Sequence, residues 1–271
     1  MRELRLHSDG LRLEDADRPT PGEGEVVVRV HAAAITRDEL EWPTDRLPTV
    51  PSHELSGVVA ETGEEVFALT PFDRDGVAAD YAAVSVAVLA PKPARLTHVE
   101  AAALPMGGLS AWQGLFVHGR LQANERVLIT GASGGVGHLA VQLARHAGAE
   151  VVEEGAADLL FDTVGGELPA AERVVTIAAE APGATFFIVE PDREQLLELA
   201  RLAAAGELVR DRLDLSARTC AGSVRPSRGT GQARQGRARC RRRLAATASP
   251  GSRSGDTGGG LNDGHAGWAG R

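Results

Sequence analysis

The sequence predicts an α/β protein with two folded domains followed by a disordered tail. Residues 2–90 hold short runs typical of β-strands, separated by Gly and Pro turns, which favours a small β-barrel. After residue 93, strand-like and helix-like segments alternate, as in a parallel sheet. Residues 216–271 lose all hydrophobic periodicity and cannot bury enough apolar surface to fold. We therefore expect a barrel domain at 1–93, a parallel-sheet domain at 94–215 and a basic, low-complexity tail at 216–271.

Charge and composition narrow the function classes. The 271 residues carry a net charge of −8, with 37 acidic and 29 basic side chains. Residues 216–271 contain eleven Arg and only two Asp, a net charge of +9, which leaves −17 on residues 1–215. Such an acidic body repels nucleic acid and anionic membranes. We therefore expect no membrane partner, and we consider nucleic-acid binding by the tail, whose one aromatic side chain is Trp268, unlikely.

Cellular location and redox state follow from what the sequence lacks. No apolar run reaches the roughly 18 residues of a membrane-spanning helix, and the N-terminal residues precede no apolar stretch of a signal peptide. The two cysteines, Cys220 and Cys240, lie late in the chain without CxxC spacing. This excludes a disulfide framework and a four-cysteine zinc lobe. We expect a cytoplasmic protein.

The first domain is expected to consist of short strands. A hairpin around Ser8-Asp9-Gly10 is the first signal, because a Gly-containing turn separates two β-type runs. The expected strands are 2–6, 11–15, 25–31, 56–61, 65–69, 78–84 and 86–90.

The second domain is expected to begin with helical segments and continue as strands and helices in alternation. The helix at 134–147 places its apolar residues on one face with a period of 3.6. A final helix is expected from Asp192, which with Gln195 forms a capping box, to Ala205, ending at Gly206. The other expected helices are 98–104 and 109–118, and the strands are 126–130, 150–153, 158–164, 173–178 and 185–190.

The strongest chemical signal is the segment Thr130-Gly131-Ala132-Ser133-Gly134-Gly135-Val136-Gly137. It leaves an apolar strand and enters an amphipathic helix, which is the context of a dinucleotide site. Glycines allow the backbone to approach a pyrophosphate, and the helix N-terminus offers free N–H groups. The alternative is a glycine-rich turn that only packs the helix on the strand.

Four ordered blocks resemble a known family. The glycine segment with its strand, Val127 to Gly137, is similar to the medium-chain dehydrogenase/reductase superfamily, in its zinc-free quinone oxidoreductase (zeta-crystallin-like) branch. The other three blocks, in chain order, are Pro51 to Gly57, Ala101 to Trp112 and Phe161 to Gly166. The resemblance implies a GroES-like N-terminal domain, a Rossmann domain, and NADPH-dependent reduction of quinones or activated enones.

The resemblance also implies positions for the site. Ser110 would lie near the nicotinamide ribose, and residues 186–189 would form the edge strand that pairs across a homodimer. The implied cofactor-binding residues are Ser110, Gly131, Ala132, Ser133, Gly134, Gly135, Val136, Gly137, Thr163, Val164, Ala178 and Ala179.

We expect no zinc. Zinc relatives use cysteine together with a Gly-His-Glu block, whereas this chain reads Ser52-His53-Glu54 and offers Asp38 where a cysteine would fall. A catalytic zinc needs about three protein ligands, and the body of the chain has no thiolate. His53 and Glu54 are then a structural pair, and the chemistry resembles direct hydride transfer to a small molecule.

No catalytic residue is assigned from the sequence. Tyr81 alternates with small apolar residues, so core packing is favoured over proton donation. His31 lies in an expected strand and has the same interpretation. His138 and His146 lie off the apolar face of their helix and are expected to face solvent.

Two observations on the sequence favour different nicotinamide cofactors. Glu153 and Glu154 lie in the window where an acid reads a ribose 2′-hydroxyl and disfavours a 2′-phosphate, which favours NADH. The family resemblance favours NADPH. We keep NADPH first and NADH as the alternative.

Two departures from the family raise a second hypothesis, a degenerate relative that binds a nucleotide weakly and turns nothing over. After 150–153, only residues 154–157 precede the next strand, where a relative carries a helix, a strand and another helix. A parallel crossover normally needs a dozen or more residues, so either 150–153 is not a parallel strand or the sheet is rewired or poorly formed. The arginine-rich sequence after about residue 209 also suggests a change of reading frame in the gene. The alternative is a native basic tail.

Overall fold

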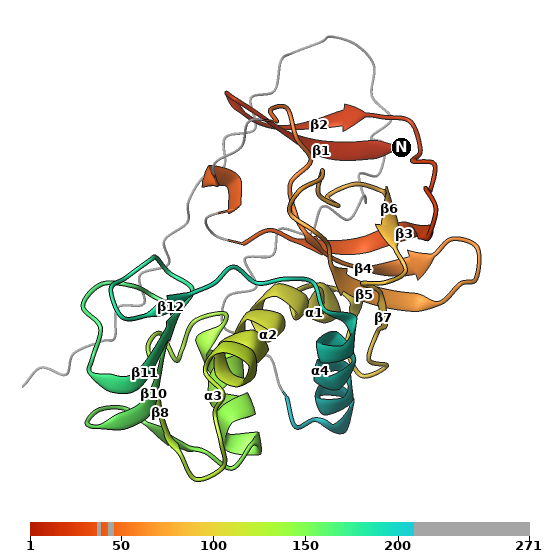
Figure 1. The fold of residues 1–271 in the computed structure, drawn as a ribbon. Helices are drawn as coiled ribbons and strands as arrows, with labels where there is room; N and C mark the ends of the chain where they lie inside the picture. Colours follow the sequence, from red (N-terminus) through yellow and green to blue (C-terminus); the bar gives the residue numbers. More distant parts are fainter. Residues whose placement is uncertain (37–38, 43–45, 209–271) are drawn as a thin grey trace, which may run out of the picture. The chain divides into compact units, whose positions relative to one another are not determined.

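The structure, a computed structural model, describes residues 1–36, 39–42 and 46–208 (Figure 1). Within these residues an antiparallel β region comes first and a parallel sheet with helices second, which confirms the predicted α/β class. The expected tail at 216–271 lies outside the described residues. None of the described helices is both long enough and apolar enough to cross a membrane.

The first region contains a hairpin and a five-stranded antiparallel sheet in the order β6-β3-β4-β5-β7. The hairpin joins the rest through the bridges Glu3 to Ala79 and Leu6 to Thr49. The strands are β1 (Arg2–His7), β2 (Gly10–Asp15), β3 (Glu25–Ala34), β4 (Glu54–Val59), β5 (Glu65–Leu69), β6 (Tyr81–Ser85) and β7 (Ala90–Pro91), with a 3-10 helix η1 (Glu39–Glu41) between β3 and β4.

Alternation along β6 decides which side chains enter the core of this sheet. Ala82 and Val84 are buried and pack with Val28 and Leu55. Tyr81 lies on the opposite face, half-buried, with the guanidinium of Arg18 4.3 Å from its ring centroid. The expectation that Tyr81 packs in the core is therefore wrong, because the strand places the neighbouring small residues inward.

The second region is built on a five-stranded parallel sheet in the order β12-β11-β10-β8-β9. Its strands are β8 (Arg126–Ile129), β9 (Glu150–Val152), β10 (Ala157–Asp162), β11 (Ala171–Thr176) and β12 (Thr185–Phe186). Its helices are α1 (His98–Ala102), α2 (Pro105–Trp112), the π-helix η2 (Gln113–His118), α3 (Gly137–His146) and α4 (Arg193–Ala205).

The short connection from β9 to β10 crosses the sheet after all. Both strands pair parallel to β8, on opposite sides of it, so 150–152 is a parallel strand. Val152 pairs with Leu128, while β10 starts at Ala157, two residues before the pairing of Leu159 with Val127. The chain must therefore cover a diagonal of about 14 Å from Val152 to Ala157, which combines two strand spacings across the sheet with a rise of three residues along it. Five Cα–Cα steps can span about 17 Å, so the rule of a dozen residues fails for strands this short.

Glycine 155 lies in this crossing with φ of 89°, a left-handed conformation that glycine adopts without strain. A Cβ at this position would lie 3.9 Å from the guanidinium of Arg126, the first residue of β8. The crossing therefore passes near the amino end of β8.

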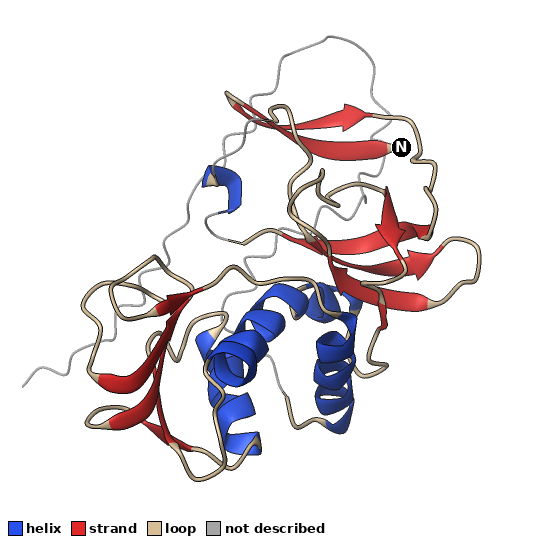
Figure 2. Ribbon diagram, viewed as in Figure 1, coloured by secondary structure: helices blue, strands red, loops and turns tan. Residues whose placement is uncertain are grey.

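One face of the parallel sheet is covered by helices. The helices lie on one side of this sheet in Figure 2. Val127, Leu159 and Phe161 share a core with residues of α2, α3 and α4. Small residues let α2 fit: a Cβ on Gly108 would lie 2.9 Å from a methyl group of Leu199 on α4. Helix α1 packs instead against β3 and β4, and the domain boundary expected at residue 93 falls in the loop between β7 and α1.

The predicted elements differ from the structure mainly at their ends. Helix α3 begins at Gly137, three residues later than expected, because residues 131–136 form the turn before it. Strand β12 has two residues rather than six. Helix α4 begins after Asp192 and ends at Gly206 as expected. Asp192 accepts a hydrogen bond from the Gln195 N–H, but the Gln195 side chain accepts from Gln113, so only half of the capping box forms.

Candidate nucleotide site

The glycine loop connects the buried end of β8 to the start of α3. Gly131 has φ of 66°, and a Cβ there would lie 2.5 Å from Val164 Cγ2 and 2.6 Å from Thr163 Oγ1. A Cβ on Gly137 would lie 2.1 Å from the Gly131 carbonyl oxygen. These two positions accept only glycine without a shift of the backbone, so the loop is folded tightly upon itself.

The outer side of the loop is open. Residues 132–135 are exposed, and a Cβ on Gly135 would meet no atom within 4 Å. Val136, the N-cap of α3, makes no side-chain capping bond. The N–H groups of Ser133, Gly135 and Val136 have no acceptor within the described part of the chain. Free N–H donors at a helix N-terminus form an anion site, and the shape leaves room for a pyrophosphate to approach the backbone.

The second wall of the site comes from the segment after β10. The Thr163 hydroxyl donates to the Thr130 carbonyl oxygen at 2.7 Å, and the Thr163 N–H donates to the Thr130 hydroxyl at 3.0 Å. Val164 lies so close to Gly131 that it leaves no room for a Cβ there, and it is 66% exposed. The structure therefore brings the predicted residues Thr163 and Val164 against the glycine loop.

Asp162, the last residue of β10, organises this wall, and the sequence analysis did not single it out. Its carboxylate is buried, with the residue 1% exposed. It accepts hydrogen bonds from the hydroxyls of Thr130 (2.5 Å) and Thr176 (2.7 Å) and from the N–H groups of Val164 (3.2 Å) and Gly165 (3.0 Å). Burial alone would raise the pKa of Asp162, but these donors outweigh it and hold the pKa below its ordinary value.

The third wall follows β11. The Ala178 N–H donates to the Thr176 hydroxyl at 3.1 Å, and a Cβ on Gly165 would lie 3.2 Å from the Ala178 Cβ. Ala178 and its neighbour Ala179 are exposed at the carboxyl end of the strand. Strands β8, β10 and β11 thus bring their carboxyl ends to one edge, where ligands bind in open parallel sheets.

Helix α2 reaches the loop from the other side. A Cβ on Gly107 would lie 3.0 Å from the Gly135 carbonyl oxygen, so the first turn of α2 touches the loop. Ser110, one turn later, is only 4% exposed. Among the described residues, no hydrogen bond is seen between the Ser110 side chain and the loop, and its implied place beside a ribose stays a prediction.

Glu153 and Glu154 follow β9 directly and are both exposed. Strand β9 is the neighbour of β8, so these glutamates lie at the carboxyl end of the strand next to the glycine loop. This is the place from which an acid reads a ribose hydroxyl.

The residues considered for a metal make other contacts. Glu54 accepts a hydrogen bond from the Met106 N–H at 2.9 Å, at the start of α2. His53 is buried against Phe72, with ring centroids 4.9 Å apart, and burial lowers its pKa. Asp38 lies outside the described residues. Among the described side chains, no three His, Cys, Asp or Glu residues converge to hold a metal ion.

The other candidate histidines differ in their surroundings. His146 pairs with Glu207 at 3.3 Å and is about half exposed, as expected for a solvent-facing residue. His138 is not fully solvent-facing: its Nε2 is buried without a hydrogen-bond partner among the described residues, and its Nδ1 lies 2.8 Å from the Gly134 carbonyl oxygen. His31 contacts His98 with the two rings tilted and their centroids 4.4 Å apart.

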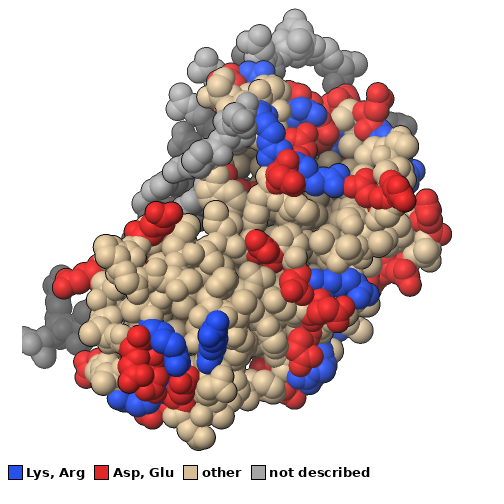
Figure 3. All heavy atoms as spheres, in the orientation of Figure 1, with Lys and Arg blue, Asp and Glu red and all other residues tan. Residues whose placement is uncertain are grey.

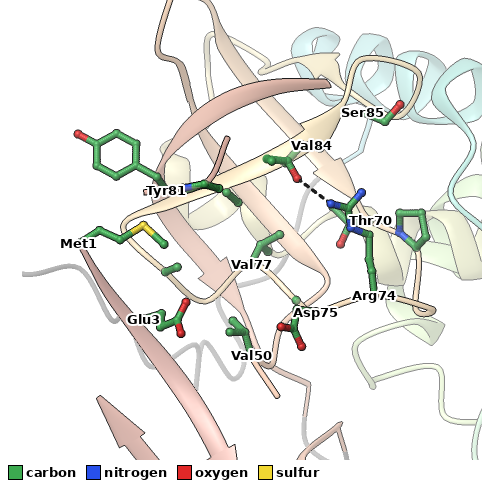
Figure 4. Close-up of a pocket in the computed structure, with 16 residues that line it drawn as sticks. Met1, Glu3, Val50, Thr70, Arg74, Asp75, Val77, Tyr81, Val84 and Ser85 are labelled. Carbon is green, nitrogen blue, oxygen red and sulfur yellow. Dashed lines mark hydrogen bonds between the residues drawn. The ribbon is translucent and has the colours of Figure 1, made fainter. Parts of the chain in front are cut away.

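A pocket of about 260 Å³ lies in the first region, away from this chemistry (Figure 4). Its charged side chains already have partners: Glu3 pairs with Arg5, and Arg74 pairs with Glu25 at 2.6 Å. Asp75 accepts a hydrogen bond from the Thr49 hydroxyl at 2.7 Å. The acidic side chains and the arginine that line this pocket are thus paired within the protein, and we place the candidate site at the glycine loop.

Comparisons with known proteins agree with this arrangement. Residues 22–86 match the alcohol dehydrogenase GroES-like domain. The chain is 37% identical over 159 residues to a probable zinc-binding mitochondrial oxidoreductase of Arthroderma benhamiae, covering 50% of this chain and 48% of the relative. It is 30% identical over 160 residues to a chloroplastic quinone oxidoreductase of Triphysaria versicolor, covering 50% and 48%.

A solved structure extends the likeness over both regions. The quinone oxidoreductase of Thermus thermophilus, studied also as its complex with NADPH, is 27% identical with a TM-score of 0.62, covering 77% of this chain and 86% of that chain. The chain spans about half the length of the curated relatives it matches. The GroES-like match, the glycine loop on a parallel sheet and these relatives confirm the predicted resemblance to the medium-chain dehydrogenase/reductase superfamily.

Proposed function

We propose that this protein is a nicotinamide-dependent, zinc-free oxidoreductase that reduces a quinone or an activated enone. The observation that carries the proposal is the glycine loop. Its Gly135 is open, and the N–H groups of Ser133, Gly135 and Val136 have no acceptor in the described residues. The relatives named quinone oxidoreductases support the substrate class. We also propose a cytoplasmic location. Relatives named mitochondrial and chloroplastic show that location differs among similar proteins.

The residues of the site would bind and orient a dinucleotide. The N–H groups of Ser133, Gly135 and Val136 would hold the pyrophosphate, aided by the positive end of the α3 dipole. Thr163 and Val164 would flank the cofactor on the β10 side, and Ala178 on the β11 side. When bound, the nicotinamide supplies the hydride, and the protein contributes orientation and exclusion of water.

We propose NADPH as the preferred cofactor, on the likeness to relatives that include the Thermus enzyme. Glu153 and Glu154 favour NADH, because a carboxylate beside a 2′-phosphate is repelled. Separate fluorescence titrations of the purified protein with NADPH and NADH decide between them. Saturable binding of neither one would reject the proposed function.

A degenerate relative without turnover is the second candidate. The specific observation in its favour is the connection of residues 153–156, which carries no helix or strand to wall the adenine side beyond β9. Measuring consumption of NADPH and of NADH with simple quinones separates the two candidates. Binding without turnover across a panel of quinones and enones would favour the degenerate relative.

We also propose a homodimer through residues 186–189. Strand β12 lies at the edge of the parallel sheet, and in the segment that follows it Phe187 and Val189 are buried while Ile188 is 68% exposed. An exposed apolar residue on a sheet edge favours pairing with a second copy. Sedimentation should show a dimer that Ile188→Asp converts to a monomer, and a monomeric wild type would reject this assembly.

A further inference from the structure

The carboxyl ends of three strands are joined by one buried charge. Asp162 ends β10, and its donors come from the end of β8 (Thr130), from the segment after β10 (Val164 and Gly165) and from the end of β11 (Thr176). Both donor hydroxyls also accept a second hydrogen bond. Thr130 also accepts the Thr163 N–H, and Thr176 also accepts the Ala178 N–H.

The residues held in this way are those that form the walls of the candidate site. Thr163 and Val164 lie so close to Gly131 that a Cβ there would collide with their side chains. The two residues therefore bound the turn at which the glycine loop leaves the sheet. A buried carboxylate is costly unless it is fully hydrogen-bonded, and hydrogen bonds to a charged acceptor are stronger than neutral ones. The arrangement is therefore stiff for as long as the charge is present.

We infer that Asp162 is a positioning residue, whose buried carboxylate holds the glycine loop and the segments after β10 and β11 in the conformation that receives the nucleotide. Its role rests on the proposed function in one respect: the ligand received is the dinucleotide proposed above. The positioning itself is a property of the free protein and can be measured without any ligand.

Asp158 provides a matched control in the same strand. It lies near the amino end of β10, and its carboxylate accepts a hydrogen bond from the Arg126 N–H at 2.6 Å. Asp158→Asn therefore removes a charged acceptor between β8 and β10, as Asp162→Asn does, but at the end of the strands opposite to the glycine loop. Both variants should lower the melting temperature.

The first readout is amide hydrogen exchange in the protein without ligand. We expect Asp162→Asn to accelerate exchange of the Thr163, Val164 and Gly165 amides about tenfold, because a charged acceptor becomes neutral. Asp158→Asn should leave these three amides unchanged and accelerate Arg126. Unchanged exchange at 163–165 in folded Asp162→Asn would overturn the inference, whether or not the wild type binds a nucleotide.

The second readout is nucleotide affinity by fluorescence titration, well below the melting temperature of each variant. Asp162→Asn should weaken NADPH or NADH binding about tenfold, and Asp158→Asn should leave it unchanged. Equal weakening by both variants would show a merely structural role and overturn the inference. If the wild type binds neither nucleotide, the proposed function fails, and hydrogen exchange alone decides the positioning role.

A milder variant covers the case in which Asp162→Asn does not fold. Thr176→Val has nearly the same shape but removes one donor to Asp162 and the acceptor of the Ala178 N–H. We expect faster exchange at Ala178 and Gly165 and a smaller loss of nucleotide affinity. Exchange at both amides equal to that of the wild type would contradict the inference.

Discussion

At the scale of single residues, the glycines of the loop have different tasks. Gly131 and Gly137 fold the loop, because a Cβ on either would collide with neighbouring atoms of the loop or its wall. At Gly134 a Cβ would lie 3.1 Å from the Gly131 carbonyl oxygen, so Gly134→Val should displace the loop as well as block a ligand. Gly135 faces open space, and a side chain there would occupy only the room proposed for the pyrophosphate.

The pair of His31 on β3 and His98 on α1 predicts how stability depends on pH. The rings of His31 and His98 contact each other at a tilt of 36°, and His98 Nδ1 lies 2.8 Å from the Ser56 hydroxyl. Burial lowers the pKa of both histidines. In the unfolded chain they titrate near the usual value of about 6.5. As the pH falls through that value, the unfolded chain takes up protons first, so the free energy of unfolding decreases until the lower folded pKa values are passed.

His31→Gln should make this loss shallower, because one of the buried histidines with a lowered pKa is removed. The measurement is urea unfolding of wild type and variant at a series of pH values from about 8 to about 5. His146→Gln is the control, since His146 lies half exposed on α3. A wild-type stability that stays constant or rises as the pH falls over this range would contradict the prediction.

Glu153 tests the cofactor preference at the level of one side chain. It is exposed and follows β9, beside the strand that leads into the glycine loop. Glu153→Arg should raise affinity for NADPH relative to NADH, because a guanidinium pairs with a 2′-phosphate and a carboxylate repels it. The same change at Glu180, an exposed glutamate after β11, is the control. An unchanged ratio of the two affinities would show that Glu153 does not reach the ribose.

At the scale of elements, the π-helix η2 packs closely against the sheet because Gly114 has no side chain. A Cβ on Gly114 would lie 2.4 Å from two ring carbons of Phe161, a fully buried residue of β10. The amide of Gln113 in the same element donates to the Glu190 carbonyl and accepts the Glu190 N–H, which fixes the chain before α4. The element therefore ties the sheet to the last helix.

Gly114→Ala should destabilise the protein although alanine is the better helix former. The gain in helix propensity is about 1 kcal/mol, whereas overpacking against a rigid ring costs about 1 to 3 kcal/mol. Thermal and urea unfolding measure the balance, and Gly135→Ala, where the Cβ meets no atom within 4 Å, is the control. A Gly114→Ala variant more stable than the wild type would show that η2 does not pack against Phe161 in this way.

The elements predicted from the sequence were those set by local pattern. Strand β5 agrees at both ends and α4 has its expected N-cap and final glycine, because alternation and capping are properties of neighbouring residues. Asp162 could not be recognised in the same way. Its partners Thr130 and Thr176 are 32 and 14 residues away and meet it only once β8, β10 and β11 pair. The crossing after β9 was misjudged because its feasibility depends on pairing register.

At the scale of the whole molecule, we predict that the protein binds no stoichiometric zinc at the segment around His53 and Glu54. Both cysteines lie beyond residue 208, and the Glu54 carboxylate is bonded to the start of α2. Zinc sites use about three protein ligands even when catalytic. Elemental analysis after dialysis against a chelator should find far less than one zinc per chain. About one zinc per chain, lost in His53→Ala, would contradict the prediction.

The acidic body bears on which macromolecular partners are possible. On the face in Figure 3, basic side chains lie beside acidic ones. Ion pairs of the described residues include Arg173–Glu125 and Arg193–Glu194. This face has no continuous basic surface of the kind that binds a phosphate backbone.

The measurement that tests the central claim most directly is nucleotide binding by Gly135→Val. The wild type should bind NADPH or NADH with a saturable change in fluorescence. Gly135→Val should lose at least about tenfold in affinity while its stability stays within about 0.5 kcal/mol, as for other exposed substitutions. Gly22→Val, at an exposed turn of the first region, should bind like the wild type. Undiminished affinity in folded Gly135→Val would contradict the assignment of the glycine loop as the nucleotide site.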